Sequence, residues 1–468
     1  MLFNSFIFIL VFLPVVVAGY FLLNKVNHKA AEVYLLIASL IFYAYNSIAY
    51  LLIIVASILV NYCIAYLMRK LIRKSDKPLA GKIWLAVGIL FNVGIIGYYK
   101  YWSFILWNAN YIFHSDFVIK NIILPLGISF YTIQQISFLI DTWNGEQTGY
   151  SFIEYALFVS FFPQLVAGPI VYHTEFIPQL HDKSKEKVNY ESLMRGIIWF
   201  VLGLSKKVLL ADRLGKAVEW GYTDVTLMSS FEAMLIMFAY AFQIYFDFSG
   251  YSDMACGIGL MFGFKLPQNF NSPYKSASIR DFWKRWHMTL TRFLTKYIYF
   301  PLGGSREGNL KLVINTLIVF LVSGIWHGAN YTFILWGLLH GLLLLFNRFT
   351  SVKKLNVPKA ITVPINFVVV SFLWTLFRAN GISQWMSFIQ KLVHPDGIGI
   401  TASFLDCFDS YLPWWLLFAI SAVLCFFFEN NYKRTIRINK VAVLLSAALL
   451  VICLFTLNRT SIFLYFNF

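Results

Sequence analysis

The sequence predicts an all-α protein that crosses a membrane many times and forms one domain over residues 1–468. Hydrophobic residues make up 59% of the chain and charged residues 13%, whereas a soluble globular domain carries about 25% charged residues. Stretches without Asp, Glu, Lys or Arg recur along the chain, and several reach the roughly 20 apolar residues that a bilayer-spanning helix needs. The aromatic content of 19% suits packed helices with aromatic belts at the membrane surfaces.

The charge balance favours basic cytoplasmic loops over any nucleic-acid partner. The net charge is +16, and no long basic tail or RNA-binding motif accompanies it. Membrane proteins concentrate Lys and Arg in their cytoplasmic loops. The five cysteines are scattered and form no CxxC pair, so we expect neither a disulfide framework nor a metal site.

The first part of the chain predicts four spans. Residues 1–24 are uncharged and lack the basic start and cleavage site of a signal peptide, so we expect a retained first span. Further spans are expected at 30–46, 48–68 and 82–106. The loop at 69–78 has five basic residues and one acidic residue, which predicts a cytoplasmic position for it and an N-terminus outside.

Two following stretches, 121–140 and 155–174, are charge-free but broken. Proline removes a backbone donor and bends helices, and the second stretch contains Pro163 and Pro169. Broken apolar stretches are typical of re-entrant or cavity-lining pieces, and ordinary kinked spans are the alternative.

The rest of the chain predicts a polar connection and further spans, which bring the total to eleven to thirteen membrane segments. No internal repeat or linker is visible. The segments after 174 are a connection at 173–195, spans at 196–212 and 230–248, an irregular Gly-rich stretch to 274, and spans at 360–378, 412–428 and 441–457.

Residues 279–300 predict a basic amphipathic helix that lies at the membrane interface. Apolar residues recur there at helical spacing among five basic residues. His287 falls on the apolar side, where it either reaches toward the interface or faces the same cavity as His327. Lys284 and Arg285 are suited to a phosphate-rich cofactor such as coenzyme A, although lipid headgroups attract the same residues.

The stretch 312–347 contains no charged residue and is too long for one simple span. A polar group of residues interrupts it at 323–330, with His327 among them. Because an ionisable residue at membrane depth is costly, it indicates a functional site. A histidine hydrogen-bonded between helices is the structural alternative.

Five segments of the chain, together with residues 161–169 and 463–468, strongly resemble the membrane-bound O-acyltransferase family. The resemblance is closest to its bacterial branch, which acts in alginate and peptidoglycan O-acetylation, and it covers essentially the whole chain. The five segments are 246–255, 261–274, 280–290, 301–306 and 323–330.

The resemblance implies a ring of helices around a central funnel, in the inner membrane of a bacterium. It maps the family's two histidines onto His327 and His287. It also implies acetyl-CoA as a cytoplasmic acyl donor and a polysaccharide acceptor outside. In this branch an extracytoplasmic SGNH/GDSL-type acetyltransferase often completes the transfer.

The residues themselves fit acyl transfer to a hydroxyl. Such a reaction needs a base, and histidine titrates near neutrality, so we assign this role to His327. His287 is the second catalytic candidate, able to hold substrate, orient the base or stabilise the oxyanion. No G-x-S-x-G motif occurs, so a serine nucleophile in this chain is unsupported.

Four further residues are candidates for the substrate channel, and one histidine is excluded from the site. Trp326 and Asn330 lie beside the base in sequence, and Trp283 and Trp286 lie beside His287. His340 would face nearly the opposite side from His327 if the helix between them were continuous.

Three other interpretations compete with acetyl transfer to an envelope polysaccharide. D-alanyl transfer to teichoic acid is the alternative within the family. A transporter with His327 on the substrate path is the alternative outside it, and a structural partner without catalysis is the third reading.

Overall fold

The structure is a computed structural model that describes the chain outside a set of short segments. The segments outside the described part are residues 73–78, 121, 147–148, 351–356, 395–396, 398, 409–412, 432, 434–437, 458–462 and 465–468. The described residues are mostly helical and contain no β-strand. Within them, six helices are long and apolar enough to cross a membrane, and three shorter apolar helices accompany these. The predicted fold class, an all-α protein that crosses a membrane several times, is therefore confirmed.

The four predicted spans at the start of the chain are found as helices, with ends that differ by up to seven residues from the prediction. A π-helical turn joins α4 to α5, so that the two form one 35-residue helix. Most of the basic loop at 69–78 lies outside the described residues. The elements are η1 (Phe8–Phe12), α1 (Leu13–Asn24), α2 (His28–Ala44), α3 (Ile48–Ile72), α4 (Leu79–Ile96), η2 (Gly97–Tyr101) and α5 (Trp102–Phe113).

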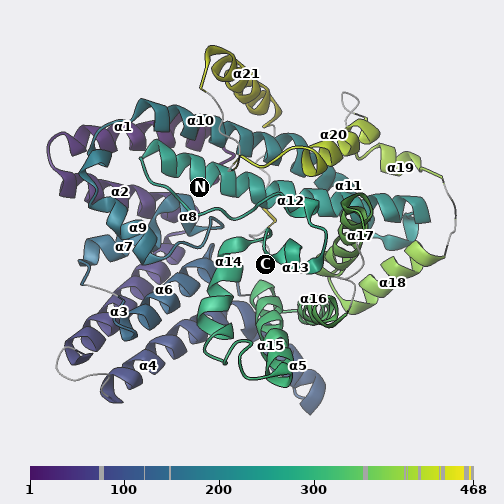
Figure 1. Cartoon of the computed structure of the whole chain (residues 1–468), viewed down its shortest axis with the longest axis horizontal. Helices are drawn as coiled ribbons and strands as arrows, with labels where there is room; N and C mark the ends of the chain where they lie inside the picture. The colour runs from purple at the N-terminus through teal and green to yellow at the C-terminus, as the bar shows by residue number, and fades with distance from the viewer. Residues whose placement is uncertain are drawn as a thin grey trace.

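The next segment is broken into short pieces, as its prolines predict. It comprises α6 (Ile128–Trp143), α7 (Phe152–Ser160), α8 (Phe162–Leu165) and α9 (His173–Leu180). Figure 1 shows α6 beside α3 and α4 at one end of the molecule. Residues 166–172 are buried without helical structure, so an ordinary kinked span does not describe 155–174. Irregular backbone at this depth is tolerated because protein surrounds it.

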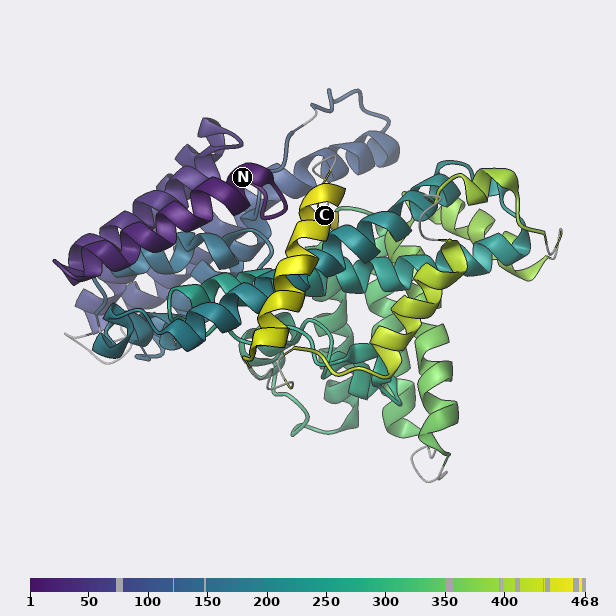
Figure 2. The same cartoon turned by 90° about the horizontal axis from the view of Figure 1, so that it is seen from above.

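A pair of helices, α10 (Tyr190–Ser205) and α12 (Ser230–Met261), forms the centre of the molecule (Figures 1 and 2). A Cβ on Gly203 would lie 2.5 Å from the carbonyl oxygen of Gly250, so glycine lets the two backbones touch. The predicted irregular stretch from 248 to 274 is wrong for 249–261, because this close packing carries α12 on to Met261, but residues 262–272 contain no helix, as predicted. The neighbouring elements are η3 (Lys183–Glu186), η4 (Lys206–Ala211), α11 (Asp212–Thr223) and η5 (Val225–Leu227).

The predicted interfacial helix at 279–300 is also wrong as a single element. The chain forms α13 (Ile279–Trp283), a break with His287 at φ 44°, α14 (Met288–Leu294) and the π-helical η7 (Thr295–Tyr299). Five of its aromatic side chains are buried in the protein interior, whereas Phe300 at its end is exposed; the buried ones are Phe282, Trp283, Trp286, Phe293 and Tyr297. The one-turn η6 (Pro273–Lys275) precedes this region.

The long uncharged stretch forms two helices, which agrees with the expectation that it is too long for one simple span. They are α15 (Asn309–His327) and α16 (Tyr331–Phe349), and residues 328–330 turn the chain between them. A Cβ on Gly324 would collide with the Phe333 carbonyl oxygen, and one on Gly337 with that of Phe320. Small residues therefore let the two helices approach closely, as is typical inside membranes.

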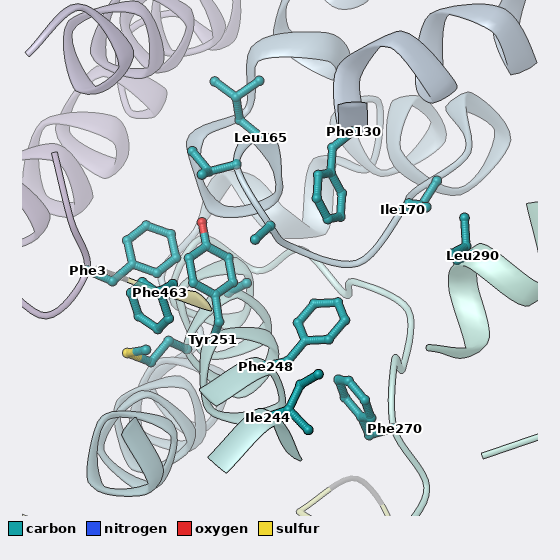
Figure 3. Close-up of a cluster of buried hydrophobic side chains, with 14 of the residues drawn as sticks. Phe3, Phe130, Leu165, Ile170, Ile244, Phe248, Tyr251, Phe270, Leu290 and Phe463 are labelled. Carbon is teal, nitrogen blue, oxygen red and sulfur yellow. The ribbon is translucent and has the colours of Figure 1, made fainter. Parts of the chain in front are cut away.

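The C-terminal helices complete one side of the molecule, and the described end of the chain returns to its centre. The helices are α17 (Lys359–Arg378), α18 (Ile382–Val393), α19 (Ala402–Leu405), α20 (Trp414–Phe426) and α21 (Lys440–Thr456). Phe463 and Phe3 both contact the ring of Tyr251 on α12, each at 4.8 Å between ring centroids (Figure 3). Residues 465–468 of the recognised C-terminal segment lie outside the described residues.

Candidate active site

His327 is the last residue of α15 and is buried at the centre of an aromatic enclosure. The helix ends there because Gly328 is fully extended. The imidazole lies edge-on to the rings of Trp336 and Phe377, at 5.3 and 5.2 Å between centroids. The side chain is 3% exposed. Aromatic rings therefore surround most of the imidazole.

His287 occupies the break between α13 and α14 in a left-handed conformation. A residue other than glycine rarely adopts a positive φ, and the cost is of order 1–3 kcal/mol. Asn269 holds the strained turn, because its carbonyl oxygen accepts from the Met288 amide at 2.9 Å. Its side-chain oxygen lies 3.1 Å from His287 Nδ1. The surrounding structure therefore fixes His287 in one orientation.

The fold brings the two histidines together from separate elements. Their ring centroids lie 6.4 Å apart. Trp326 lies beside both rings, at 4.9 Å from His327 and 6.0 Å from His287. The sequence left open whether His287 reaches the membrane interface or faces His327; in the structure the two rings are neighbours, although neither histidine lines one of the cavities described below.

The two tryptophans near His287 differ in their surroundings. Trp283 lines two cavities and contacts Trp336, which separates it from His327. Trp286 packs against Trp374, with ring centroids 4.8 Å apart. It lines none of the cavities described below. Of the two predicted channel residues, the geometry therefore favours Trp283.

An apolar cavity of about 230 Å³ runs between α14, α15 and α16, and we call it the arginine-lined cavity. Arg280 and Arg348 line it, and both are exposed. Neither arginine has an ion-pair partner within the described part of the chain. The cavity also includes Trp283 and Ser323, the latter one helical turn before His327.

A second cavity, the lysine-lined groove of about 590 Å³, lies on the other side of α14. Lys284 lines it, as do Arg292 and Lys296. Arg292 pairs with Glu175, and Lys296 lies 3.0 Å from Asp141. These two charges are thus partly neutralised.

Of the two basic residues proposed for cofactor binding, only Lys284 lines a cavity. The guanidinium of Arg285 donates to Asp281 at 2.9 Å and to the Asn271 carbonyl at 3.3 Å. It therefore stabilises the loop before α13.

A third cavity, the amide-lined pocket of about 430 Å³, lies at the opposite end of α16. Asn330 lines it and donates to the carbonyl of Asn380 at 2.7 Å. Phe377 lines it too and contacts His327. Asn330 and Arg348 mark the two ends of α16, about 27 Å apart at 1.5 Å per residue. Cavities thus approach His327 from two sides.

Two polar residues of this region were missed or misplaced by the sequence analysis. Lys100, inside the α4–α5 span, donates to the carbonyl of Trp326 at 2.5 Å; a lysine within an apolar stretch was the available signal. His340 lies 4.8 Å from the ring of Trp336, which in turn contacts His327. The exclusion of His340 assumed a continuous helix, and the turn at 328–330 removes that assumption.

Comparison with known proteins identifies the family of the chain. The sequence matches the membrane-bound O-acyltransferase family over residues 128–383, more than half of the chain, and the match contains both histidines. The chain belongs to this family. It is therefore an acyltransferase of the membrane, as the resemblance predicted.

The relatives include bacterial enzymes with named acceptors. The chain is 38% identical to the peptidoglycan O-acetyltransferase of Helicobacter pylori, over 100% of this chain and 98% of that protein. It is 36% identical to the probable alginate O-acetylase AlgI of Pseudomonas aeruginosa, over 82% of this chain and 73% of that protein. The teichoic acid D-alanyltransferase of Bacillus subtilis is 28% identical, over 50% of this chain and 62% of that protein.

Proposed function

We propose that this acyltransferase moves an acetyl group from cytoplasmic acetyl-CoA across the membrane, for O-acetylation of a cell-envelope or secreted polysaccharide. The observation that carries the proposal is the position of His327 between cavities at the two ends of α16. The names of the more similar relatives favour acetyl over D-alanyl as the group transferred.

The donor enters through the arginine-lined cavity. Arg306 lies in the turn before α15, Lys311 in its first turn and Arg348 at the end of α16. Glu307 pairs with Lys311, so this end keeps a net positive charge, whereas residues 328–330 at the other end carry no charge. By the positive-inside rule, the basic end faces the cytoplasm. Arg280 and Arg348 suit the phosphates of coenzyme A, and the apolar interior suits its acyl-bearing arm.

The acceptor reaches His327 from the amide-lined pocket. The immediate acceptor is a hydroxyl of the polysaccharide or of an extracytoplasmic SGNH/GDSL-type acetyltransferase that completes the transfer. Amide and charged side chains in that pocket, among them Gln243, Asn330 and Arg378, suit a polar acceptor. The enzyme acts in the inner membrane of a bacterium.

His327 acts as the general base. It takes the proton from the acceptor hydroxyl as the oxygen bonds to the thioester carbonyl carbon; the carbon–sulfur bond then breaks and the proton passes to the departing thiolate. His287 is close enough to stabilise the negative oxygen of the intermediate or to hold the substrate. General-base help of this kind is worth about 10²–10⁴ in rate.

The test measures base-labile esters of the envelope in cells that carry or lack the gene, with mass identification of the released acid. We expect acetate to fall with loss of the gene in one glycan fraction, which then identifies the acceptor. Loss of alanine instead would assign the enzyme to teichoic acid. No change in any ester would contradict the proposal and favour a substrate path through His327.

A further inference from the structure

Lys100 is an ionisable residue, with a positive charge when protonated, within the longest apolar helix of the described part of the chain. It lies in the π-helical turn η2, within the span Leu79–Phe113. Such a charge is costly inside a membrane unless other groups bind it. Within the described part of the chain, no carboxylate lies within ion-pair distance of Lys100. Its partners are instead groups at the active site.

Those partners belong to the end of α15 and the start of α6. The Lys100 Nζ donates to the Trp326 carbonyl at 2.5 Å and to the Ser129 hydroxyl at 3.4 Å. It also lies over the indole ring of Trp326, 5.8 Å from the centroid, where a cation is attracted to the negative face of the ring.

Tyr101, the next residue, makes a parallel contact. Its hydroxyl donates to the carbonyl of Ile325 at 2.5 Å. The π-helical turn adds one residue to the helix at this point, a feature that is frequent at functional sites. Two consecutive side chains of one span thus bind two consecutive carbonyls of another.

These contacts provide hydrogen-bond donors for carbonyls at the C-terminal end of α15. The last carbonyls of a helix lack a partner within the helix itself, and inside a membrane water does not replace that partner. The Ile325 carbonyl accepts from the Gly328 amide at 3.2 Å as well as from Tyr101, and the Trp326 carbonyl accepts from Lys100. The C-terminal end also carries a partial negative charge, which a cation stabilises. Because His327 directly follows Trp326, whatever holds this turn also sets the position of the imidazole.

We propose that Lys100 is a positioning residue: it caps the C-terminal turn of α15 and thereby holds His327 in its reactive position. It acts through the Trp326 carbonyl and does not touch the substrate. The inference rests on the proposed role of His327 as the base. Tyr101 assists by holding the Ile325 carbonyl.

The test compares full-length variants purified in detergent or nanodiscs. Lys100→Met keeps the length of the side chain without its charge, Lys100→Arg restores a cation, and Tyr101→Phe removes only the neighbouring contact. Lys82→Met is the matched control, because Lys82 is exposed on the same span. Each variant is assayed for kcat and KM with acetyl-CoA and for hydrogen exchange of the amides at 323–330.

We expect Lys100→Met to lower kcat by about 10- to 100-fold, the effect of a misplaced catalytic group, and to leave the KM for acetyl-CoA within about twofold. Exchange at the end of α15 should become faster. Lys100→Arg should recover a substantial part of kcat, and Lys82→Met should resemble the wild type. A Lys100→Met enzyme with wild-type kcat per folded molecule, even if less stable, would overturn the proposal.

The test still decides on Lys100 if the Lys100→Met protein does not accumulate or if the wild type does not use acetyl-CoA. If Lys100→Met does not accumulate, Tyr101→Phe decides: slower turnover with faster exchange supports the proposal, and wild-type behaviour contradicts it. If the wild type does not use acetyl-CoA, the proposed function fails by itself. The exchange measurement then decides on Lys100 alone, and unchanged exchange in Lys100→Met rejects its role.

Discussion

Two buried polar clusters of this protein are organised in opposite ways. One, the amide cluster, joins α3, α4 and α6 through Ser57, Asn61, Asn92 and Gln135. Asn61 donates to Gln135 at 2.5 Å, Asn92 donates to Asn61 at 2.6 Å, and Ser57 donates to Gln135 at 2.7 Å. No cavity described above includes any of these four side chains.

The other cluster surrounds His287 and His327. Here aromatic rings form most of the surroundings of each imidazole, and Asn269 holds His287. Cavities approach from both sides.

The difference separates structural from reactive polar residues inside a membrane. Side chains that bind one another across helices hold the helices together. Under the proposed function, the side chains that aromatic rings enclose between cavities are held for a substrate, because an ionisable residue buried in a membrane indicates a functional site.

The largest expected effect comes from breaking the reactive cluster at His327. His327→Ala removes the base and should lower acyl transfer by about 10²–10⁴-fold, while the protein still inserts and accumulates. Envelope ester content, normalised to protein level, checks this. His394→Ala, at an exposed position, is the control. Normal acylation by a well-expressed His327→Ala protein would reject the assignment of the base.

Replacement of His287 should have a smaller effect. His287→Asn keeps a polar residue that tolerates the left-handed conformation, whereas His287→Ala does not. We expect both to reduce kcat by about tenfold or more, which corresponds to ~1.4 kcal/mol. Steady-state kinetics on purified protein measures the loss. Unchanged kinetics in both variants would leave His287 as a structural residue of the turn.

Breaking the amide cluster should affect stability and not chemistry. Asn61→Leu removes the bonds to Gln135 and Asn92, and hydrogen bonds between membrane helices are worth about 0.6–2 kcal/mol. Thermal unfolding in detergent should shift downward while kcat per folded molecule stays at the wild-type value. Cys63→Ala, exposed on the same helix, should change neither. A large loss of kcat in Asn61→Leu would remove the distinction between the two clusters.

The smallest effect is expected at the arginine-lined cavity. Arg280→Ala and Arg348→Ala should each raise the KM for acetyl-CoA a few-fold and leave kcat unchanged, because exposed charges contribute about 1 kcal/mol or less. The increase should shrink at high salt, which screens exposed charges. Lys284→Ala, in the neighbouring groove, is the comparison. An effect at Lys284 alone would move the donor to the lysine-lined groove.

Much of the fold could be predicted because hydropathy and chain breaks are local properties. The interruption of the uncharged stretch 312–347 followed from its length and from the polar residues at 323–330, whereas the end of α15 at His327 and the separate helix α16 were seen only in the structure. The length of α12 did not, because the glycine contacts with α10 that extend it are tertiary. The pattern at 279–300 predicted one helix where the structure has two short ones, because aromatic residues at helical spacing fit two short helices as well as one.

The sequence by itself determined that this is a multi-pass membrane acyltransferase and that His327 is a polar residue in a costly position. Only the tertiary structure decided that His287 lies 6.4 Å from it, that cavities approach from two sides, and that Lys100 binds the turn before it. Local composition decides which stretches enter a membrane, because transfer free energies add along the chain. Which distant side chains meet depends on helix ends, left-handed residues and close backbone contacts, and these are properties of the folded molecule.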